Sequence, residues 1–259
     1  MPDLSGKVAI VTGGAQGIGR GIVHVLADYH ADVVFNDIDT AAAAQTVREC
    51  HGASGETLYV PGDVRNEADV KRLVEETIAR HGRIDAVINN AATILVESME
   101  EGTVETWDQL FQVNVRSIFL TSKHALPYMK RQGGGSIVNV GSVSSLIGQQ
   151  NTPAYCATKG AVLMLTKAMA LDYAAHAIRV NCLCPGITDT PMLERHMSHC
   201  ENPAEELAAR LRRVPTGKLM APRDLGESAA FLVSSAAAQV TGTTIVVDGG
   251  YSACAEFSP

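Results

Sequence analysis

Short apolar runs alternate along the chain with longer segments in which apolar side chains recur at helical spacing. In the segment 66–81, Val70, Leu73, Val74 and Ile78 lie on one face of a predicted helix. The next run, 84–88, is largely apolar without alternation, which is typical of a strand covered on both faces. The pattern predicts strands at 8–11, 33–35, 57–60, 84–88, 136–140, 178–183 and 245–247. It predicts helices at 18–29, 40–50, 66–81, 104–130 and 154–173.

Strand and helix alternating this often indicate an α/β fold. We expect a doubly wound, Rossmann-type parallel sheet of about seven strands with helices on both faces. No linker or repeat interrupts the pattern, so residues 1–259 are expected to form a single domain. Pro127 is expected to bend or end the helix at 104–130. The polar segment 187–215 is either a surface loop with a helix or a lid over a substrate site.

Composition and charge exclude several classes of protein. Lys and Arg number 21 and Asp and Glu 28, which gives a formal net charge of −7. This balance offers no electrostatic footprint for nucleic acid or an anionic membrane surface, and no apolar run is long enough to span a bilayer. The six cysteines form no CxxC pair, and the first residues carry no apolar signal segment. We therefore expect a reduced, cytoplasmic protein with neither nucleic-acid nor membrane partners.

A glycine-rich turn joins the first predicted strand to the first predicted helix. Residues 12–19 read TGGAQGIG, a GxxxGxG variant of the dinucleotide-binding fingerprint. Glycines let a diphosphate approach the backbone closely, and the N–H groups and dipole of a helix N-terminus attract the anion. The residues expected to hold a dinucleotide here are Gly13, Gln16, Gly17, Ile18 and Gly19.

An acidic residue follows the second predicted strand. Asp37 lies close to the spacing of about 20 residues at which such an acid binds the adenosine ribose hydroxyls. Its carboxylate repels a 2′-phosphate, and neither Gln16 nor Ile38 supplies a cation for one. The sequence therefore predicts NAD rather than NADP as the cofactor; the alternative is a solvated aspartate in a turn.

Polar residues gather where the strand at 136–140 ends and the helix at 154–173 begins. Tyr155 and Lys159 are four residues apart and share a helix face, and Ser142 follows the strand. Thr152 is a candidate cap for this helix, with Pro153 in its first turn. Ligands bind at the carboxyl ends of strands in open parallel sheets, so these side chains are expected to meet there.

Further motifs run through the chain in a fixed order. They are Asp63-Val64, Asn89-Asn90-Ala91, Asn114, Pro185-Gly186 with Thr190, and Asp248-Gly249-Gly250. With TGGAQGIG, Ser142 and the YCATK of residues 155–159, this set covers nearly the whole chain and resembles the short-chain dehydrogenase/reductase family, in its ordinary branch of roughly 250 residues. Ala92 stands where that family usually has glycine, which adds a methyl group near the cofactor cleft.

The resemblance implies a role for each matching residue. Tyr155 is the expected acid/base, the Lys159 ammonium lowers its pKa, Ser142 binds the substrate oxygen, and Asn114 holds a water that relays the proton. Lys159 also binds the nicotinamide ribose. The other residues expected at the cofactor are Asp63, Val64, Asn90, Pro185, Gly186, Thr188 and Thr190.

The substrate itself is less well defined. Several amides and hydroxyls near the expected site favour a hydroxylated molecule such as a sugar or polyol, although these groups could equally cap turns. The candidate contacts are Ser144, Gln149, Gln150, Met192 and His196. His196, His199 and Cys200 cluster, but a structural zinc site usually needs a fourth ligand, so we expect no metal. We interpret Arg210, Arg212 and Arg213 as a solvated helix face; the alternative, a contact to an acidic substrate, has no support in the sequence.

Two broader expectations follow. The helix at 154–173 is apolar nearly all round, which predicts burial against another copy of the chain in a homotetramer or homodimer. The reaction expected is hydride transfer between a secondary alcohol or sugar-type hydroxyl and NAD. The alternatives are reduction of a ketone in the cell and a silent NAD-binding regulator. Tyr155, Lys159 and Ser142 are all present, which argues against the regulator.

Overall fold

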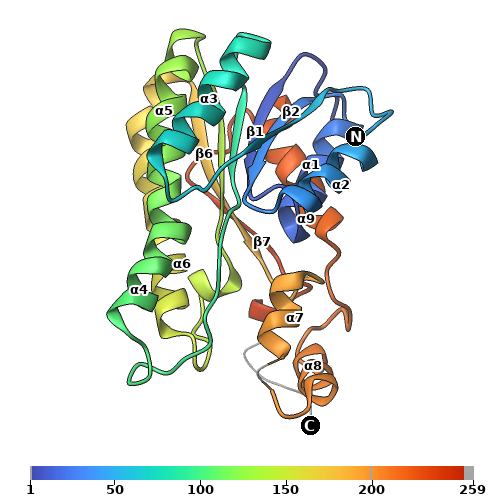
Figure 1. Ribbon diagram of the computed structural model, residues 1–259, viewed down its shortest axis with the longest axis vertical. Coiled ribbons are helices and arrows are strands. Elements are labelled where there is room, and N and C mark those ends of the chain that lie inside the picture. Colours follow the sequence, from blue (N-terminus) through green and yellow to red (C-terminus); the bar gives the residue numbers. More distant parts are fainter. Residues whose placement is uncertain (1, 199, 254–259) are drawn as a thin grey trace.

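The computed structural model describes residues 2–198 and 200–253. Within them, seven parallel strands form one sheet in the order β3-β2-β1-β4-β5-β6-β7 (Figure 1). This confirms the predicted doubly wound α/β fold. The strands are β1 (Val8–Thr12), β2 (Asp32–Asp37), β3 (Thr57–Pro61), β4 (Ala86–Asn89), β5 (Gly135–Val140), β6 (Ile178–Pro185) and β7 (Thr244–Val247).

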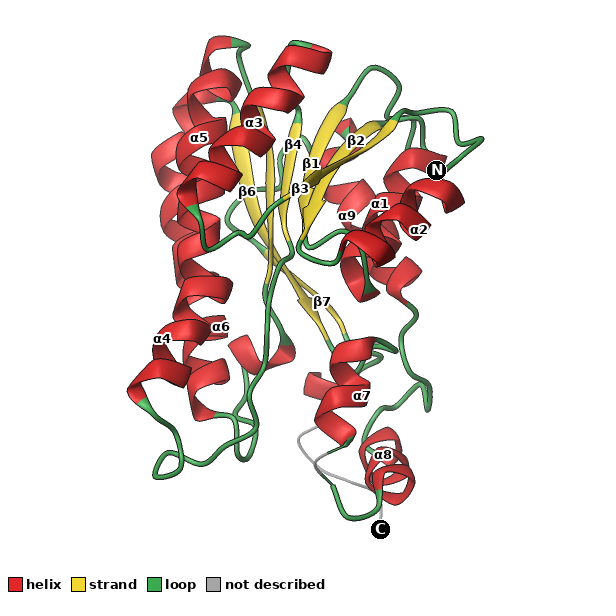
Figure 2. Cartoon of the chain, in the orientation of Figure 1, coloured by secondary structure: helices red, strands yellow, loops and turns green. Residues whose placement is uncertain are grey.

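Helices cover both faces of the sheet (Figure 2). On one face, Ile22 and Leu26 of α1 pack in a core with Leu225 of α9. On the other, Leu73 of α3 and Met129 of α5 belong to a second core. The helices are α1 (Gly17–Asp28), α2 (Thr40–Glu49), α3 (Glu67–His81), α4 (Val104–Phe111), α5 (Ser117–Arg131), α6 (Pro153–Tyr173), α7 (Pro191–Met197), α8 (Pro203–Arg212) and α9 (Pro222–Val233).

The strand order places the site. The chain leaves β1 toward β2 on one side and returns to β4 on the other, so the connections diverge at the carboxyl ends of β1 and β4. This is the switch point at which open α/β sheets bind ligands. Helices α7 and α8 lie beyond this edge of the sheet (Figures 1 and 2).

The structure has two α-helices joined by a π-helical segment where the sequence predicts one helix at 104–130. A π-helical segment, Gln112–Arg116, separates α4 from α5, whereas Pro127 lies within α5 and does not end it. Such π segments occur mostly at functional sites, and this one contains Asn114. Its side chain binds groups outside the helix, as described below, which explains why the apolar periodicity alone does not reveal it.

The structure differs from the sequence-based expectation at three further places. The segment 187–215 contains both α7 and α8, and α9 was not predicted at all. The N-terminus of α9 combines Pro222 with a hydrogen bond from the Ala221 N–H to Asp224. Thr152 occupies the predicted N-cap position of α6 with Pro153 after it, but its hydroxyl donates to the Gln149 carbonyl at 3.1 Å and makes no capping bond to the helix. Among the described residues, no helix is long and apolar enough to cross a membrane.

Candidate active site

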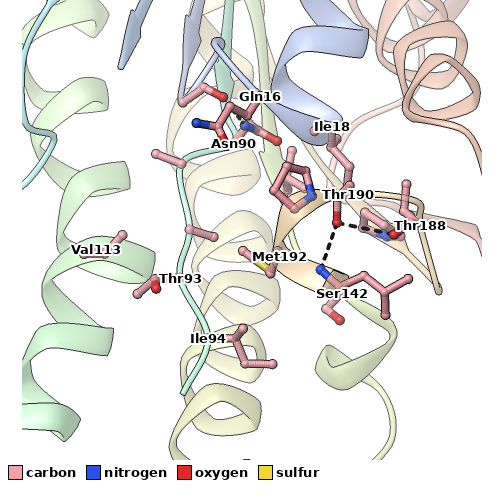
Figure 3. A pocket seen from close by; sticks show the side chains of 18 of the residues that line it. Gln16, Ile18, Asn90, Thr93, Ile94, Val113, Ser142, Thr188, Thr190 and Met192 are labelled. Carbon is pink, nitrogen blue, oxygen red and sulfur yellow. Dashed lines mark hydrogen bonds between the residues drawn. The ribbon is translucent and has the colours of Figure 1, made fainter. Parts of the chain in front are cut away.

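A cavity of about 680 Å³ opens at the carboxyl edge of the sheet. It receives the loops that follow β1, β2, β3, β4, β5 and β6, and also side chains from α6, α7 and α8. Figure 3 shows Gln16 and Asn90 at one end of it, and Thr93 and Ile94 across from Thr190 and Met192. A volume of this size accommodates a cofactor-sized ligand.

The glycine-rich turn leaves room for a dinucleotide diphosphate. Gly13 and Gly17 have φ of +65° and +51°, a region that side chains rarely adopt. A Cβ on Gly19 would lie 2.0 Å from the Gly13 carbonyl oxygen, so Gly19 packs beneath the turn rather than lining the cavity. The N-terminus of α1 begins at Gly17 and faces the same space. These residues fit a nicotinamide dinucleotide.

Asp37 stands at the end of β2 with its carboxylate held in place. One oxygen accepts from the Ala15 N–H at 3.1 Å and the other from the Asp39 N–H at 3.0 Å. The nearby Asp39 binds the Gln16 amide at 2.6 Å. Sequence reasoning overlooked Arg65, which also lines this end of the cavity and is bound by Asp63 through its Nε and Nη2.

Other predicted cofactor residues surround the same space. Asn90 donates from Nδ2 to the carbonyls of Thr12 and Gly13 at 3.0 and 2.9 Å, and thereby fixes the glycine turn. The Thr190 hydroxyl caps α7 by accepting from the Leu193 N–H at 3.2 Å and donates to the Thr188 carbonyl at 3.3 Å, and dashed lines in Figure 3 mark these two bonds. The remaining predicted residues that line the cavity are Gln16, Ile18, Val64, Pro185, Gly186 and Thr188.

Ser142, Tyr155 and Lys159 converge on the cavity floor from β5 and α6. Burial raises the pKa of Tyr155 to about 12, and a hydrogen bond with Ser142 acts in the opposite direction. Lys159 lies with its Nζ 5.7 Å from the centre of the Tyr155 ring and donates to the Val140 carbonyl at 2.9 Å. In the chain alone the pKa of Tyr155 is set chiefly by burial, with Ser142 acting against it, so the lowering expected from Lys159 stays a prediction.

Burial also dominates at Lys159, where it lowers the pKa to about 8. The folded chain therefore resists protonation of this amine, whereas the unfolded chain accepts a proton up to about pH 10.5. Below pH 8 the amine is protonated in both states, so the fold bears the whole free-energy cost of burying the ammonium. This cost falls as the pH rises from 8 to 10.5, because only the unfolded chain then binds the proton, and it is gone above 10.5, where the amine is neutral in both states.

Replacing this lysine should therefore stabilise the fold while damaging the site. We expect Lys159→Met to raise the free energy of unfolding by about 1–3 kcal/mol at pH 7, with a smaller gain at pH 10. Urea denaturation at both pH values measures the difference. Lys167→Met, at an exposed position of the same helix, is the control and should change little. A gain that does not depend on pH would contradict the assignment to charge burial.

Asn114 is buried and bound on all sides by protein. Its Oδ1 accepts from the Thr93 N–H at 2.8 Å, and its Nδ2 donates to the Thr93 carbonyl and to the Thr158 hydroxyl at 2.9 and 3.1 Å. Both amide hydrogens are therefore engaged, and Val113 rather than Asn114 lines the cavity. The side chain ties the π segment to the loop after β4 and to α6.

The predicted substrate contacts divide into two groups. Gln149, Met192 and His196 line the cavity, but Ser144 and Gln150 do not. Ser144 is buried and donates to the Gln149 Oε1 at 3.0 Å, so it orients a lining residue instead of forming the wall. Gln150 is exposed.

Besides Arg65, two more basic residues that were not among the predicted site residues reach the cavity. Arg195 and Arg210 both line it, so the interpretation of Arg210 as part of a solvated face is wrong. The helix spacing of Arg210, Arg212 and Arg213 does not reveal that α8 turns its first arginine toward α7. Of the residues considered as metal ligands, His199 lies outside the described part of the chain. The described residues contain no group of three side chains that could hold a metal ion.

Comparison with known proteins defines the class. The family model described as Enoyl-(Acyl carrier protein) reductase matches residues 13–252. L-fucose dehydrogenase of Mus musculus is 39% identical over 95% of this chain and 88% of its own. Cyclopentanol dehydrogenase of Comamonas sp. is 36% identical over 98% of this chain and 100% of its own. A short-chain dehydrogenase/reductase from Burkholderia xenovorans superposes with a TM-score of 0.95 at 35% identity, covering 99% of this chain and 100% of that one.

The chain therefore belongs to the short-chain dehydrogenase/reductase family. It is an oxidoreductase with a dehydrogenase-type fold, and its class uses nicotinamide cofactors. The resemblance predicted from the ordered motifs is confirmed.

Proposed function

We propose that this protein is an NAD-dependent dehydrogenase that oxidises a secondary hydroxyl on a ring, either a cycloalkanol or a sugar. The observation that carries the proposal is that Ser142, Tyr155 and Lys159 line one cavity together with the glycine turn and Asp37. The names of the relatives support the substrate class, because cyclopentanol is a ring secondary alcohol and L-fucose is a sugar.

The chain's own residues would act as follows. The Ser142 hydroxyl, oriented by accepting from the Ser144 N–H at 3.0 Å, hydrogen-bonds the substrate oxygen. Tyr155 takes the hydroxyl proton as general base, and this requires its pKa to fall from about 12. The Lys159 ammonium supplies part of that fall by favouring the phenolate. The glycine turn and Asp37 would hold NAD, which would supply the hydride acceptor. Asn114, whose amide is bound by Thr93 and Thr158, holds the loop after β4 and the start of α6 in place around the site.

A substrate panel tests this function directly. Purified protein with NAD is offered cyclopentanol, cyclohexanol, L-fucose, open-chain polyols, hydroxy acids and steroids, and NADH formation is followed by absorbance. We expect turnover with ring secondary alcohols or sugars at rates well above those with open-chain secondary alcohols. Formation of no NADH from any ring alcohol or sugar, by protein that binds NAD, would sink the proposal.

We also propose that α5 and α6 form the contact between copies of the chain in a homotetramer or homodimer. Phe119 of α5 is 56% exposed, and Met164 and Leu171 of α6 are 62% and 82% exposed. Covering these apolar side chains would stabilise an assembly. We expect native mass spectrometry to show a multiple of 27.4 kDa, whereas a monomer at micromolar concentration would contradict the assembly.

With no helix in the described chain suited to span a membrane, we propose that the enzyme works in the cytoplasm.

A further inference from the structure

The cavity carries positive charge that the proposed reaction does not use. Arg195 on α7 and Arg210 on α8 line it, and within the described part of the segment 187–215 no aspartate or glutamate does. The acidic lining residues Asp37, Asp39 and Asp63 all follow β2 or β3, where the adenosine end of a dinucleotide would bind. The two ends of the cavity thus differ in charge.

Arg210 is held in one orientation by two neighbours. Its Nε donates to Glu206, one turn earlier on α8, at 2.7 Å, and its Nη2 donates to the His196 Nε2 on α7 at 3.0 Å. An arginine has donors only, so the His196 Nε2 must accept and this imidazole is neutral with its proton on Nδ1. The Arg210 side chain is 24% exposed, and its guanidinium still has N–H groups that these two bonds do not use.

The local charge fits a monoanion. Glu206 offsets one of the two arginine charges, and Arg195 forms no ion pair with any residue that the structure describes. A planar guanidinium held in place binds a carboxylate through two parallel hydrogen bonds. A phosphate monoester, which carries nearly two charges at neutral pH, would find only about half of its charge balanced here.

We propose that the substrate is a ring secondary alcohol that also carries a carboxylate. Arg210, with Arg195, binds the carboxylate from the side of α7 and α8, while the hydroxyl faces Ser142 and Tyr155. His196 acts as a positioning residue that orients the Arg210 guanidinium. This inference rests on the proposed function, since it names the substrate class of the same site.

The experiment compares substrates that differ only in this charge. The holoenzyme with NAD is offered 3-hydroxycyclopentanecarboxylate and 4-hydroxycyclohexanecarboxylate, each beside its uncharged carboxamide and the corresponding phosphate monoester. We expect kcat/KM for a carboxylate to exceed that for its carboxamide by about 10- to 100-fold, the range of a charged hydrogen bond. Arg210→Gln should abolish this preference by raising the KM of the carboxylate, with kcat and the KM of NAD nearly unchanged.

Two further variants separate binding from folding. Arg212→Gln, at an exposed position of the same helix, should keep the preference, and Arg210→Lys should retain part of it because the charge remains but the fork is lost. Equal kcat/KM for carboxylate and carboxamide, or a preference that survives in Arg210→Gln, would overturn the inference, as would a stronger preference for the phosphate. A rise in the KM of NAD alone would assign Arg210 to the cofactor instead.

A binding measurement decides the inference separately from the proposed function. If no ring alcohol is oxidised, the proposed function fails. Calorimetry of cyclohexanecarboxylate binding to the protein–NADH complex then still tests the arginines. Binding that Arg210→Gln weakens at least tenfold, with cyclohexanecarboxamide binding poorly to both, supports a carboxylate site. Equal binding of the two compounds, or no binding of either, contradicts it.

Discussion

Replacing Tyr155 with phenylalanine should reduce kcat/KM by about 10³- to 10⁴-fold and leave NAD binding intact. The substitution removes one oxygen from a ring that is only 7% exposed, so the packing of α6 stays as it is. What is lost is the group that, in the proposed mechanism, exchanges the proton with the substrate hydroxyl. The Ser142 hydroxyl loses its tyrosine partner but still accepts from the Ser144 N–H.

The pH profile of the unaltered enzyme tests the same assignment. Burial holds the pKa of Tyr155 at about 12 in the chain alone, so the phenolate needed to accept a proton is scarce at neutral pH. Positive charge close to the phenol would lower that pKa, and kcat/KM for alcohol oxidation should therefore rise with pH until the tyrosine is ionised. Tyr173→Phe, at the far end of α6, is the matched control and should change neither rate nor profile. Near-normal turnover in Tyr155→Phe would show that another group moves the proton.

Much of the fold is readable from local pattern. Apolar strands buried on both faces and helices with one apolar face differ in periodicity, so the elements from β1 to α3 appear where the sequence predicts them. Helix α9 was missed although the sequence carries its signals: Pro222 opens it, the Asp224 carboxylate accepts from the Ala221 N–H, and its buried residues Leu225, Ala229 and Leu232 recur at helical spacing. The π segment escaped because its cause lies elsewhere in space, in the contacts of Asn114 with Thr93 and Thr158.

In the site, too, residues placed by local spacing could be predicted, whereas residues placed by contacts distant in sequence could not. The glycine turn, Tyr155 and Lys159 are set by spacing within one turn or helix, so the sequence places them together. Arg210 could not be placed in this way, because its orientation depends on His196, 14 residues earlier on a different helix. Arg65 presents the same difficulty, since only the structure shows that a cation lies near Asp37 and is already bound by Asp63.

Asp37 should make the enzyme prefer NAD to NADP by about 10²- to 10³-fold, or roughly 3–4 kcal/mol. Its carboxylate is fixed by the Ala15 and Asp39 N–H groups at the end of β2, where it can accept from ribose hydroxyls but repels a 2′-phosphate. The charge of Arg65 is already offset by Asp63, whose pKa is lowered chiefly by this partner, so Arg65 offers a 2′-phosphate little net positive charge.

The substitution Asp37→Asn separates charge from shape. It keeps the size of the side chain and removes the repulsion, so the KM for NAD should rise several-fold while the KM for NADP falls, and the preference should shrink to about tenfold or less. Initial rates with both cofactors at saturating substrate measure it, and Asp172→Asn, at an exposed position on α6, is the control. Because kcat depends on Tyr155 and Ser142 at the other end of the cavity, it should hardly change with NAD. An unaltered enzyme that binds NADP as tightly as NAD would show that Arg65, and not Asp37, governs this end of the site.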